Sequence, residues 1–572
     1  SVSAGSLSFT NKVGLDDVTG SAVSIVSPDY SASGNLKAGT YKQSVTSTLG
    51  GTDAANYSLV GGFSTATNNY TVNALALTGS IASGSSDYGS SLSPGSATFT
   101  NAITNDVLGT ATVAVATAGN TSTSGNLKAG SYTGAQSVTA LSGTDAANYT
   151  YTGVTGNYTV NAIALSISGI AANNKTYDGN TDATVSVASV AKTGLIAGDL
   201  LTVSASGSFA DKDVATGKTI TLSSTYGGND RANYTITNQA STTANISQLA
   251  STTWVGASGG SYFDANNWQG LGQSSVGAVP DKSNVAEAII PVGMEVEVSS
   301  TAISDVGTNV PAGATATVIN NAGTLLINLA TSATSATMSA VVQGAGDLVL
   351  NRGLLTLGVA NGYTGTTTVN AGTLTYGIND ALASGALTVN GGVFALGAYN
   401  DIVGVVTLTD GSITGTGGVL TGSSFTVAKG SISAILAGNG GLTKTSSNTV
   451  ILSGVNTYTG VTTINEGVLS VASLAGGGAA SGIGAASASA GNLILGGGTL
   501  KYTGSSVAID RAFTLSDATS STIEVSTAGS NLTLNGAAAN STGSFIKTGA
   551  GTLTFNADNL YGGSTTVNAG SD

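Results

Sequence analysis

Internal repetition constrains this chain more than any other feature of its sequence. Three segments within the first 250 residues return nearly unchanged 88 to 92 positions later, and a diverged third copy keeps GGNDRANYTI at Gly227–Ile236. Self-similarity at such a period indicates small structural units that follow one another along the chain. The repeated pairs are Ser33–Tyr41 (SGNLKAGTY) with Ser124–Tyr132, Gly51–Tyr57 (GTDAANY) with Gly143–Tyr149, and Asn68–Thr78 (NNYTVNALALT) with Gly156–Ser166.

Each unit has the pattern of β structure. Thr, Val, Ser, Ile and Tyr alternate in short runs such as Gly551–Phe555 (GTLTF), and Gly-, Asn- and Asp-rich turns separate the runs. Long runs of Leu, Glu, Lys and Arg, which form helices, are absent from the sequence. We therefore predict an all-β protein with four domains: three tandem small β modules at residues 1–78 (incomplete), 79–166 and 167–250, then a repeat region at 251–572.

The N-terminal modules resemble a known group. Lys175–Thr181 (KTYDGNT), the closing segments Asn69–Ala74 and Asn157–Ala162 (NYTVNA), and the GTDAANY element are similar to the YDG and MBG-type modules that bacterial surface adhesins and large autotransporter-like proteins carry in tandem. The resemblance makes the first two modules MBG-like and the third YDG-type. The first module has no equivalent of Asp87-Tyr-Gly or Tyr177-Asp-Gly, so we expect the chain to begin inside a domain.

A second family of repeats occupies residues 251–572. The segment NGYTGTTTVNAGTL at Asn361–Leu374 returns at Asn456–Leu469 and at Asn559–Gly570, each time after a strand-like run. These copies resemble the passenger-associated transport repeat of autotransporters, which implies a right-handed parallel β-helix, or solenoid. The third copy stops near Asp572, so we also expect the chain to be a segment of a longer protein with an outer-membrane translocator elsewhere.

A β-helix makes specific predictions for the repeats. Val369, Leu374, Ile464 and Leu469 should point inward at period two, with coils of roughly 20–25 residues. The Asn-x-Gly triplets at Asn370–Gly372, Asn465–Gly467 and Asn568–Gly570 should form turns that need a left-handed residue. We expect Tyr363, Tyr458 and Tyr561 to pack over the preceding coil, with exposed tyrosines that stack on carbohydrate as the alternative.

The two tryptophans of the chain, Trp254 and Trp268, lie in the segment Thr252–Pro291 at the start of the repeat region. A solenoid needs a cap that shields its first coil from water, because the end of its core is otherwise open. We therefore predict that both indoles belong to this cap. A ligand-stacking site is the alternative.

Composition narrows the chemistry that this chain can perform. It has no Cys and no His, which excludes thiolate nucleophiles, Ser-His-Asp and Cys-His hydrolases and the commonest zinc ligands. A polysaccharide hydrolase or lyase would need paired carboxylates, and from residue 251 onward only Glu295 and Glu297 share a strand face two positions apart. We predict no catalytic residue, no cofactor and no enzyme activity.

Calcium is the remaining candidate for a bound ion. Asp178, Asn180 and Asp182 form one cluster, and Asp211 with Asp213 forms another, but neither has the spacing of a known calcium loop. Asp and Asn at such positions often accept hydrogen bonds from their own backbone. We therefore expect turn residues and no metal site.

The charge of the chain bears on its partners. Sixteen Lys and Arg against 29 Asp and Glu give a formal net charge of −13, which disfavours binding to nucleic acids. The resemblance implies an extracellular adhesin on the bacterial surface that binds a host or neighbouring cell, a glycan or a matrix component, or that builds biofilm. A self-assembling extracellular filament is the first alternative and a polysaccharide-acting β-helix enzyme the second. The sequence does not identify ligand-binding residues.

Overall fold

The computed structural model describes residues 5–570, which form β-strands joined by turns and short 3₁₀ helices. Contacts divide the chain into two compact units: Ser1–Ala171 with Val185–Ser206 and Leu222–Thr242, and Ala172–Thr184 with Gly207–Thr221 and Thr243–Asp572. This division leaves the four domain boundaries as predictions, and we keep the names first, second and third module for residues 1–78, 79–166 and 167–250. Among the described residues no helix is long and apolar enough to cross a membrane.

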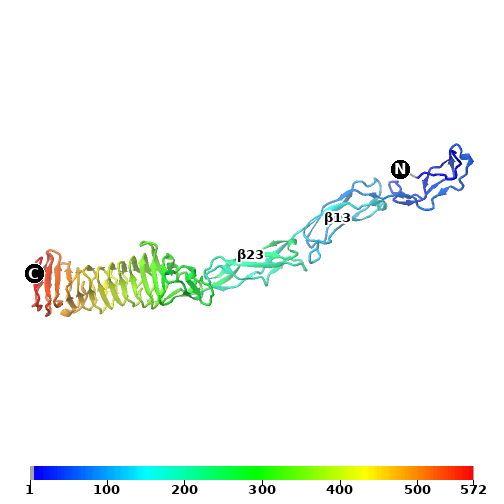
Figure 1. Cartoon of the computed structure of the whole chain (residues 1–572). Coiled ribbons are helices and arrows are strands. Elements are labelled where there is room, and N and C mark those ends of the chain that lie inside the picture. Colours follow the sequence, from blue (N-terminus) through cyan, green and yellow to red (C-terminus); the bar gives the residue numbers. More distant parts are fainter. Residues whose placement is uncertain (1–4, 571–572) are drawn as a thin grey trace. The chain divides into compact units, whose positions relative to one another are not determined.

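The second module illustrates the architecture of the first unit. Its largest sheet has the order β10 (Gly84–Asp87), β15 (Thr155–Asn161), β13 (Gly130–Leu141) and β12 (Ala111–Val115), and β13 is labelled in Figure 1. The β10–β15 pair is parallel, and the other two pairs are antiparallel. The core is small because the alternating strands bury one face only, with Tyr158 and Val160 among its buried side chains.

Each GTDAANY-type repeat forms the same short element. The 3₁₀ helices η1 (Ala54–Asn56), η2 (Ala146–Asn148) and η3 (Arg231–Asn233) each end at a tyrosine in extended conformation. The strands that begin at the latter two tyrosines, β14 (Tyr149–Thr150) and β24 (Tyr234–Thr237), pair in parallel with β8 (Leu75–Ala76) and β16 (Ile163–Ser168). Because β8 and β16 directly follow the closing segment of the preceding module, the chain enters each new module already hydrogen-bonded to it.

The second unit contains a parallel solenoid, whose stacked coils run from green to red in Figure 1. One twelve-stranded parallel sheet begins with β27 (Gly260–Ser261) and ends with β56 (Thr514–Leu515). A second runs from β33 (Ser335–Met338) to β61 (Thr565–Val567). These sheets confirm the predicted all-β fold with a parallel solenoid.

Register between coils places like residues above one another. Leu355 pairs with Leu374 and Leu374 with Phe394, so that apolar side chains form continuous stacks inside the solenoid. The four residues predicted to point inward are at most 1% exposed, which confirms the period-two pattern: Val369, Leu374, Ile464 and Leu469.

Coil length departs from the expected 20–25 residues in both directions. Phe425 pairs with Leu442, only 17 positions later, because a bend at Gly438 and Asn439 takes the place of a longer corner. Thr462 pairs with Leu493, 31 positions later, and the additional residues form an irregular segment with turns within 472–492. The buried Arg511 guanidinium holds this segment by donating hydrogen bonds to the carbonyl oxygens of Ala475, Ala479 and Gly484.

An aromatic cluster closes the first coil of the solenoid. Trp254 on β26 (Leu249–Trp254) pairs with Trp268 on β28 (Trp268–Gly270), and their rings meet edge to face at 5.2 Å. Trp268 is fully buried and donates from its indole nitrogen to the Tyr262 carbonyl at 2.6 Å. Both indoles belong to the buried core, which confirms the cap, and the ligand-stacking alternative is wrong because neither ring face is accessible.

Candidate functional site: polar joints between successive modules

A compact loop recurs in the first and second modules, in the first unit. In the first module the Ser31 amide donates to the Asn35 carbonyl at 2.8 Å, and the Gly34 amide donates to the Ser31 carbonyl at 2.9 Å. The same two bonds close Ser122–Asn126 at 2.8 and 3.0 Å. We call Ser31–Ala38 and Ser122–Ala129 the donor loops, because three backbone amides of each donate to side chains of the next module.

Three side chains of the second module bind the donor loop of the first module. Each accepts one backbone N–H of the loop. The pairs are Ala32 N with Asp145 Oδ2 at 3.2 Å, Ser33 N with Asp106 Oδ1 at 3.3 Å, and Ala38 N with Asn148 Oδ1 at 2.9 Å. We call Asp106, Asp145 and Asn148 the acceptor triad of the second module.

The joint between the second and third modules repeats this geometry. Its acceptor triad is Asp199, Asp230 and Asn233, of which Asp230 and Asn233 are at most 1% exposed. The repeated motifs are therefore the two halves of one contact: GTDAANY supplies acceptors and SGNLKAG supplies donors. The pairs are Thr123 N with Asp230 Oδ1 at 3.1 Å, Ser124 N with Asp199 Oδ1 at 3.3 Å, and Ala129 N with Asn233 Oδ1 at 2.9 Å.

Tyrosines orient the first aspartate of each triad. Tyr149 donates to Asp106 Oδ2 at 2.6 Å, and Tyr234 donates to Asp199 Oδ2. Burial alone would raise the pKa of Asp199, but hydrogen bonds from Ser124, Tyr234 and Tyr88 outweigh it and hold this pKa below its usual range. Asp199 is therefore a carboxylate at neutral pH and accepts charge-assisted hydrogen bonds, which are stronger than neutral ones.

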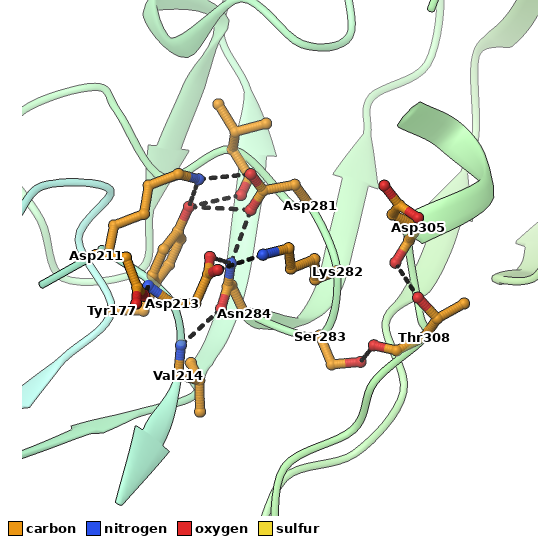
Figure 2. A network of polar contacts seen from close by, with 12 residues as sticks. Tyr177, Asp211, Asp213, Val214, Asp281, Lys282, Ser283, Asn284, Asp305 and Thr308 are labelled. Carbon is orange, nitrogen blue, oxygen red and sulfur yellow. Dashed lines mark hydrogen bonds and ion pairs between the residues drawn. The ribbon is translucent and has the colours of Figure 1, made fainter. Parts of the chain in front are cut away.

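The second unit contains a third joint, between third-module residues and the start of the solenoid (Figure 2). The buried Tyr177 hydroxyl donates to the Val279 carbonyl at 3.0 Å and lies 3.3 Å from Asp281 Oδ1. Lys212 Nζ donates to Asp281 Oδ2 at 2.5 Å and to the Tyr177 hydroxyl at 2.9 Å. Burial, reinforced by the charge of Asp281, raises the pKa of Tyr177, so that it stays a neutral donor.

Asn284 has the same role in this joint as Asn148 and Asn233 have in the other two. Its Oδ1 accepts the Val214 amide at 2.8 Å, and its Nδ2 donates to Asp213 Oδ1 at 2.9 Å. Lys282 forms an ion pair with Asp213. Burial would raise the pKa of Asp213, but the bonds from Lys282 and Asn284 lower it. The loop Asp211–Val214 carries two aspartates, which form ion pairs with Lys218 and Lys282.

Each of the two tyrosine motifs contains a glycine that lets a neighbouring segment of the chain approach closely: Gly89 follows Tyr88, and Gly179 lies two positions after Tyr177. Gly89 and Gly179 both have φ of +80°, in the left-handed region that favours glycine. A Cβ atom on Gly179 would lie 2.0 Å from the Gly277 carbonyl oxygen, and one on Gly89 would lie 2.0 Å from Ile196 Cδ1. The Tyr-Asp-Gly and Asp-Tyr-Gly motifs are thus contact motifs, with a tyrosine that donates and a glycine that leaves room.

Comparisons with known proteins bear on both families of repeats. Residues 159–244 match the YDG domain, and residues 341–375, 442–471 and 545–571 match the passenger-associated-transport-repeat. The chain is similar to the adhesin BmaC autotransporter of Brucella suis biovar 1 (strain 1330), with 45% identity over 160 residues. That stretch is 27% of this chain and 4% of the relative. No solved structure matches the chain. The matches confirm the resemblance to an autotransporter-type adhesin passenger.

The acidic clusters weighed as calcium ligands form turns and ion pairs instead. Asp178 accepts from Lys175 Nζ at 2.7 Å and from the Asn180 amide at 3.1 Å. Asp211 accepts the Asp213 amide at 2.8 Å and pairs with Lys218. Among residues 5–570, no group of three or more acidic side chains is arranged to hold a metal ion.

The glutamates weighed as a catalytic pair lie side by side on β30 (Glu295–Val298), as expected from their spacing. Glu297 Oε1 accepts a hydrogen bond from Asn328 Nδ2 at 2.8 Å, on the strand of the next coil. The side-chain amide of Asn328 does not titrate and carries no charge, unlike the second carboxylate of a catalytic pair. This contact is one of several side-chain bonds that link neighbouring coils.

The repeat tyrosines lie as predicted. Tyr363 and Tyr458 are at most 1% exposed, and their hydroxyls bond Thr367 and Thr462 at 2.6 and 2.8 Å. Tyr561 packs against Phe545 of the preceding coil, with ring centroids 6.2 Å apart. Carbohydrate stacking on Tyr363 or Tyr458 is wrong because both rings are covered. The turn glycines Gly372, Gly467 and Gly570 have φ of +78°, +60° and +71°, as the predicted turns require.

Sequence reasoning missed the acceptor triads. The aspartates and asparagines of GTDAANY were visible as repeats, but the first aspartate of each triad lies outside the repeated motifs, at Asp106 and Asp199. One signal was present: both repeated motifs persist while the strands between them diverge. Two motifs kept together in the first and second modules point to a contact between them.

Proposed function

We propose that this chain is a segment of a surface-displayed bacterial adhesin, in which tandem modules and a solenoid present binding surfaces outside the cell. The observation that carries the proposal is the 45% identity to an adhesin autotransporter in a chain that also contains three transport repeats. The target is a component of a host or neighbouring cell surface, a glycan or a matrix protein.

The joints support a load-bearing role. Each joint combines a strand that continues from one module into the sheet of the next with at least three polar contacts between loops far apart in sequence. Separating two modules breaks all of these hydrogen bonds at once, and a hydrogen bond to a charged group contributes about 1.5–3 kcal/mol. A tether between a cell and its target needs this property.

The transport repeats support secretion in an unfolded state followed by folding outside. Coils of a solenoid contact their neighbours only, so that each coil can add to the one already folded. The absence of cysteine from the sequence suits such a route, since no disulfide can form before export. We propose that the solenoid folds coil by coil at the cell surface and has no catalytic role.

Adhesion is tested with beads that carry the purified chain. Beads are added under flow to cultured epithelial cells, to wells coated with fibronectin, collagen or laminin, and to cells of the source bacterium. We expect retention at least about tenfold above albumin-coated beads on one of these surfaces. Retention equal to the albumin control on every surface would overturn the proposal for this segment.

The contribution of the joints is tested with a matched pair of variants. D199A removes an acceptor from the joint between the second and third modules, whereas D182A removes an exposed aspartate of the third module. Under increasing flow, beads with D199A should detach earlier than the parent, and beads with D182A should not. Equal detachment of the two variants would contradict a load-bearing role while leaving adhesion itself intact.

A further inference from the structure

The first module contains an acceptor triad of its own, formed by Asp16, Asp53 and Asn56. Its internal bonds match those of the other modules. The Asp17 amide donates to Asp53 Oδ2 at 2.9 Å, and the equivalent bonds to Asp145 and Asp230 are both 2.8 Å. Tyr57 donates to Asp16 Oδ2 at 2.6 Å, as Tyr149 does to Asp106. The triad is therefore already folded in its binding geometry.

The acceptors that bind a donor loop elsewhere have no partner here. Asp16 Oδ1 and Asn56 Oδ1 make no hydrogen bond with any of residues 5–570, whereas the equivalent oxygens of Asp106 and Asn148 accept loop amides. Burial differs accordingly. Asp145 is 2% exposed and Asp230 is fully buried, but Asp53 is half-buried and Asn56 is exposed. The first module thus presents a preformed acceptor surface to solvent.

We propose that Asp16, Asp53 and Asn56 form a docking site for the donor loop of a further module of this type. The occupant is defined by chemistry already present twice in this chain: a closed Ser-x-Ser-Gly-Asn-Leu-Lys-Ala loop that offers three outward backbone N–H groups. A loop of this conformation places the amides of its second, third and eighth residues on Asp53, Asp16 and Asn56.

A second copy of the same chain is not the occupant. Both donor loops of the chain are bound by its own second and third modules. The corresponding loop of the third module, at Asp211–Val214, is held by Lys282 and Asn284. A second copy would have to open one joint to form another, with no net gain in contacts. A further module carries an uncommitted loop, so its docking adds a complete joint.

The register of the repeats allows a direct test. Ser6-x-x-Phe9-Thr-Asn is equivalent to Ser96-x-x-Phe99-Thr-Asn, so a duplicated segment of residues 1–95 can be fused to the N-terminal side of residues 6–572 without disturbing the repeat. The extended chain then contains one additional donor loop directly before the Asp16 triad. Hydrogen exchange is followed by mass spectrometry on the peptide that spans Asp29–Tyr41, which has the same sequence in both copies.

We expect a single, slowly exchanging population of this peptide, as in the parent chain, because both loops are bound. If the triad does not bind a loop, the peptide will split into two equal populations, and the additional one will exchange about tenfold or more faster. That split would overturn the proposal.

Matched variants test whether the slow exchange of the loop peptide depends on this triad. N56A in the second copy of the duplicated segment should release half of the loop peptide into the fast population, and adding D53A should complete the release. The same substitutions in the leading copy, whose triad has no module before it, should change nothing. Equal effects of the two placements would contradict docking at this triad. Peptides from the solenoid, such as Leu354–Tyr376, report that the rest of the chain is folded.

Discussion

The hydroxyl of Tyr88 donates a 2.5 Å hydrogen bond to Oδ2 of Asp199, a residue 111 positions further along the chain. Tyr88 belongs to the Asp-Tyr-Gly motif of the second module, and Asp199 belongs to the acceptor triad of the third. Asp199 also accepts from Tyr234 and from the Ser124 amide. Three segments distant in sequence therefore meet on one carboxylate, which makes this joint sensitive to single substitutions.

Y88F should weaken this joint without changing the shape of the side chain. A hydrogen bond to a charged group contributes about 1.5–3 kcal/mol, so the amides of Thr123 and Ser124 should exchange roughly 10- to 100-fold faster. Hydrogen exchange with mass spectrometry measures this directly. Y30F is the control, because Tyr30 is 54% exposed and should leave these amides unaffected. Unchanged exchange in Y88F would mean that the bond adds no stability.

Acid should loosen the joints of the first unit. The pKa values of Asp106 and Asp199 lie below their usual range, because hydrogen bonds from Ser33 and Tyr149, and from Ser124, Tyr234 and Tyr88, outweigh the effect of burial. The unfolded chain then binds protons more readily than the folded one. The stabilisation is complete above the ordinary aspartate pKa of about 3.9 and is lost as the pH falls through the lower folded values.

Calorimetry at pH 7, 4 and 3 checks this expectation. Two probes separate the units, since both tryptophans lie in the second unit and far-ultraviolet circular dichroism reports on the whole chain. As the pH falls, the loss of stability in the first unit should change the dichroism signal before the tryptophan fluorescence changes. D199N is expected to be less stable than the parent at pH 7 and to lose less stability on acidification. A parent chain as sensitive to acid as D199N would contradict the assignment.

Much of the fold was predictable because a repeat presents the same pattern several times. The period-two alternation around Val369 and Ile464, the Asn-x-Gly turns and the tryptophan cap follow from local rules about strands, turns and exposed ends. The joints were not predictable in the same way. Asp106 and Asp199 acquire their role only when residues about a hundred positions apart come together, and a single carboxylate in a loop carries no periodic signal. The 31-residue coil was also missed, because Arg511 holds its additional residues through their carbonyl oxygens, and such bonds leave no periodic pattern in the sequence.

Asp401 in the solenoid should respond to pH with the opposite sign. It is 2% exposed and accepts from the Tyr376 hydroxyl at 2.5 Å and from the Leu382 amide at 2.9 Å. Burial raises its pKa above the ordinary value despite these bonds. The folded chain therefore binds this proton more readily than the unfolded chain, and the contribution of Asp401 to stability falls as the pH rises through its folded pKa.

Urea unfolding of the parent and D401N between pH 3 and pH 7 measures the contribution of Asp401 to stability. The asparagine keeps an acceptor for Tyr376 but does not titrate. We expect the free energy of unfolding of the parent, minus that of D401N, to decrease as the pH rises. A difference that stays constant across this range would show that Asp401 does not change its protonation there.

G372A should destabilise the solenoid through the backbone of one turn. Gly372 has φ of +78°, and a Cβ atom there would lie 2.3 Å from the Gly353 carbonyl oxygen of the preceding coil. A left-handed conformation costs a residue with a side chain about 1–3 kcal/mol, and the close contact adds to this cost. Because each coil is hydrogen-bonded to its neighbours, the strain cannot relax by moving one coil alone.

Denaturant unfolding of G372A should give a midpoint below that of the parent, with the loss in free energy at the upper end of this range or beyond. G491A is the matched control, since Gly491 is exposed, has no positive φ and has no atom within 4 Å of a Cβ placed on it. Its free energy of unfolding should stay within about 0.5 kcal/mol of the parent. Equal stability of the two variants would mean that the turn accepts a side chain, and that the Asn-x-Gly triplets are kept for a reason other than backbone geometry.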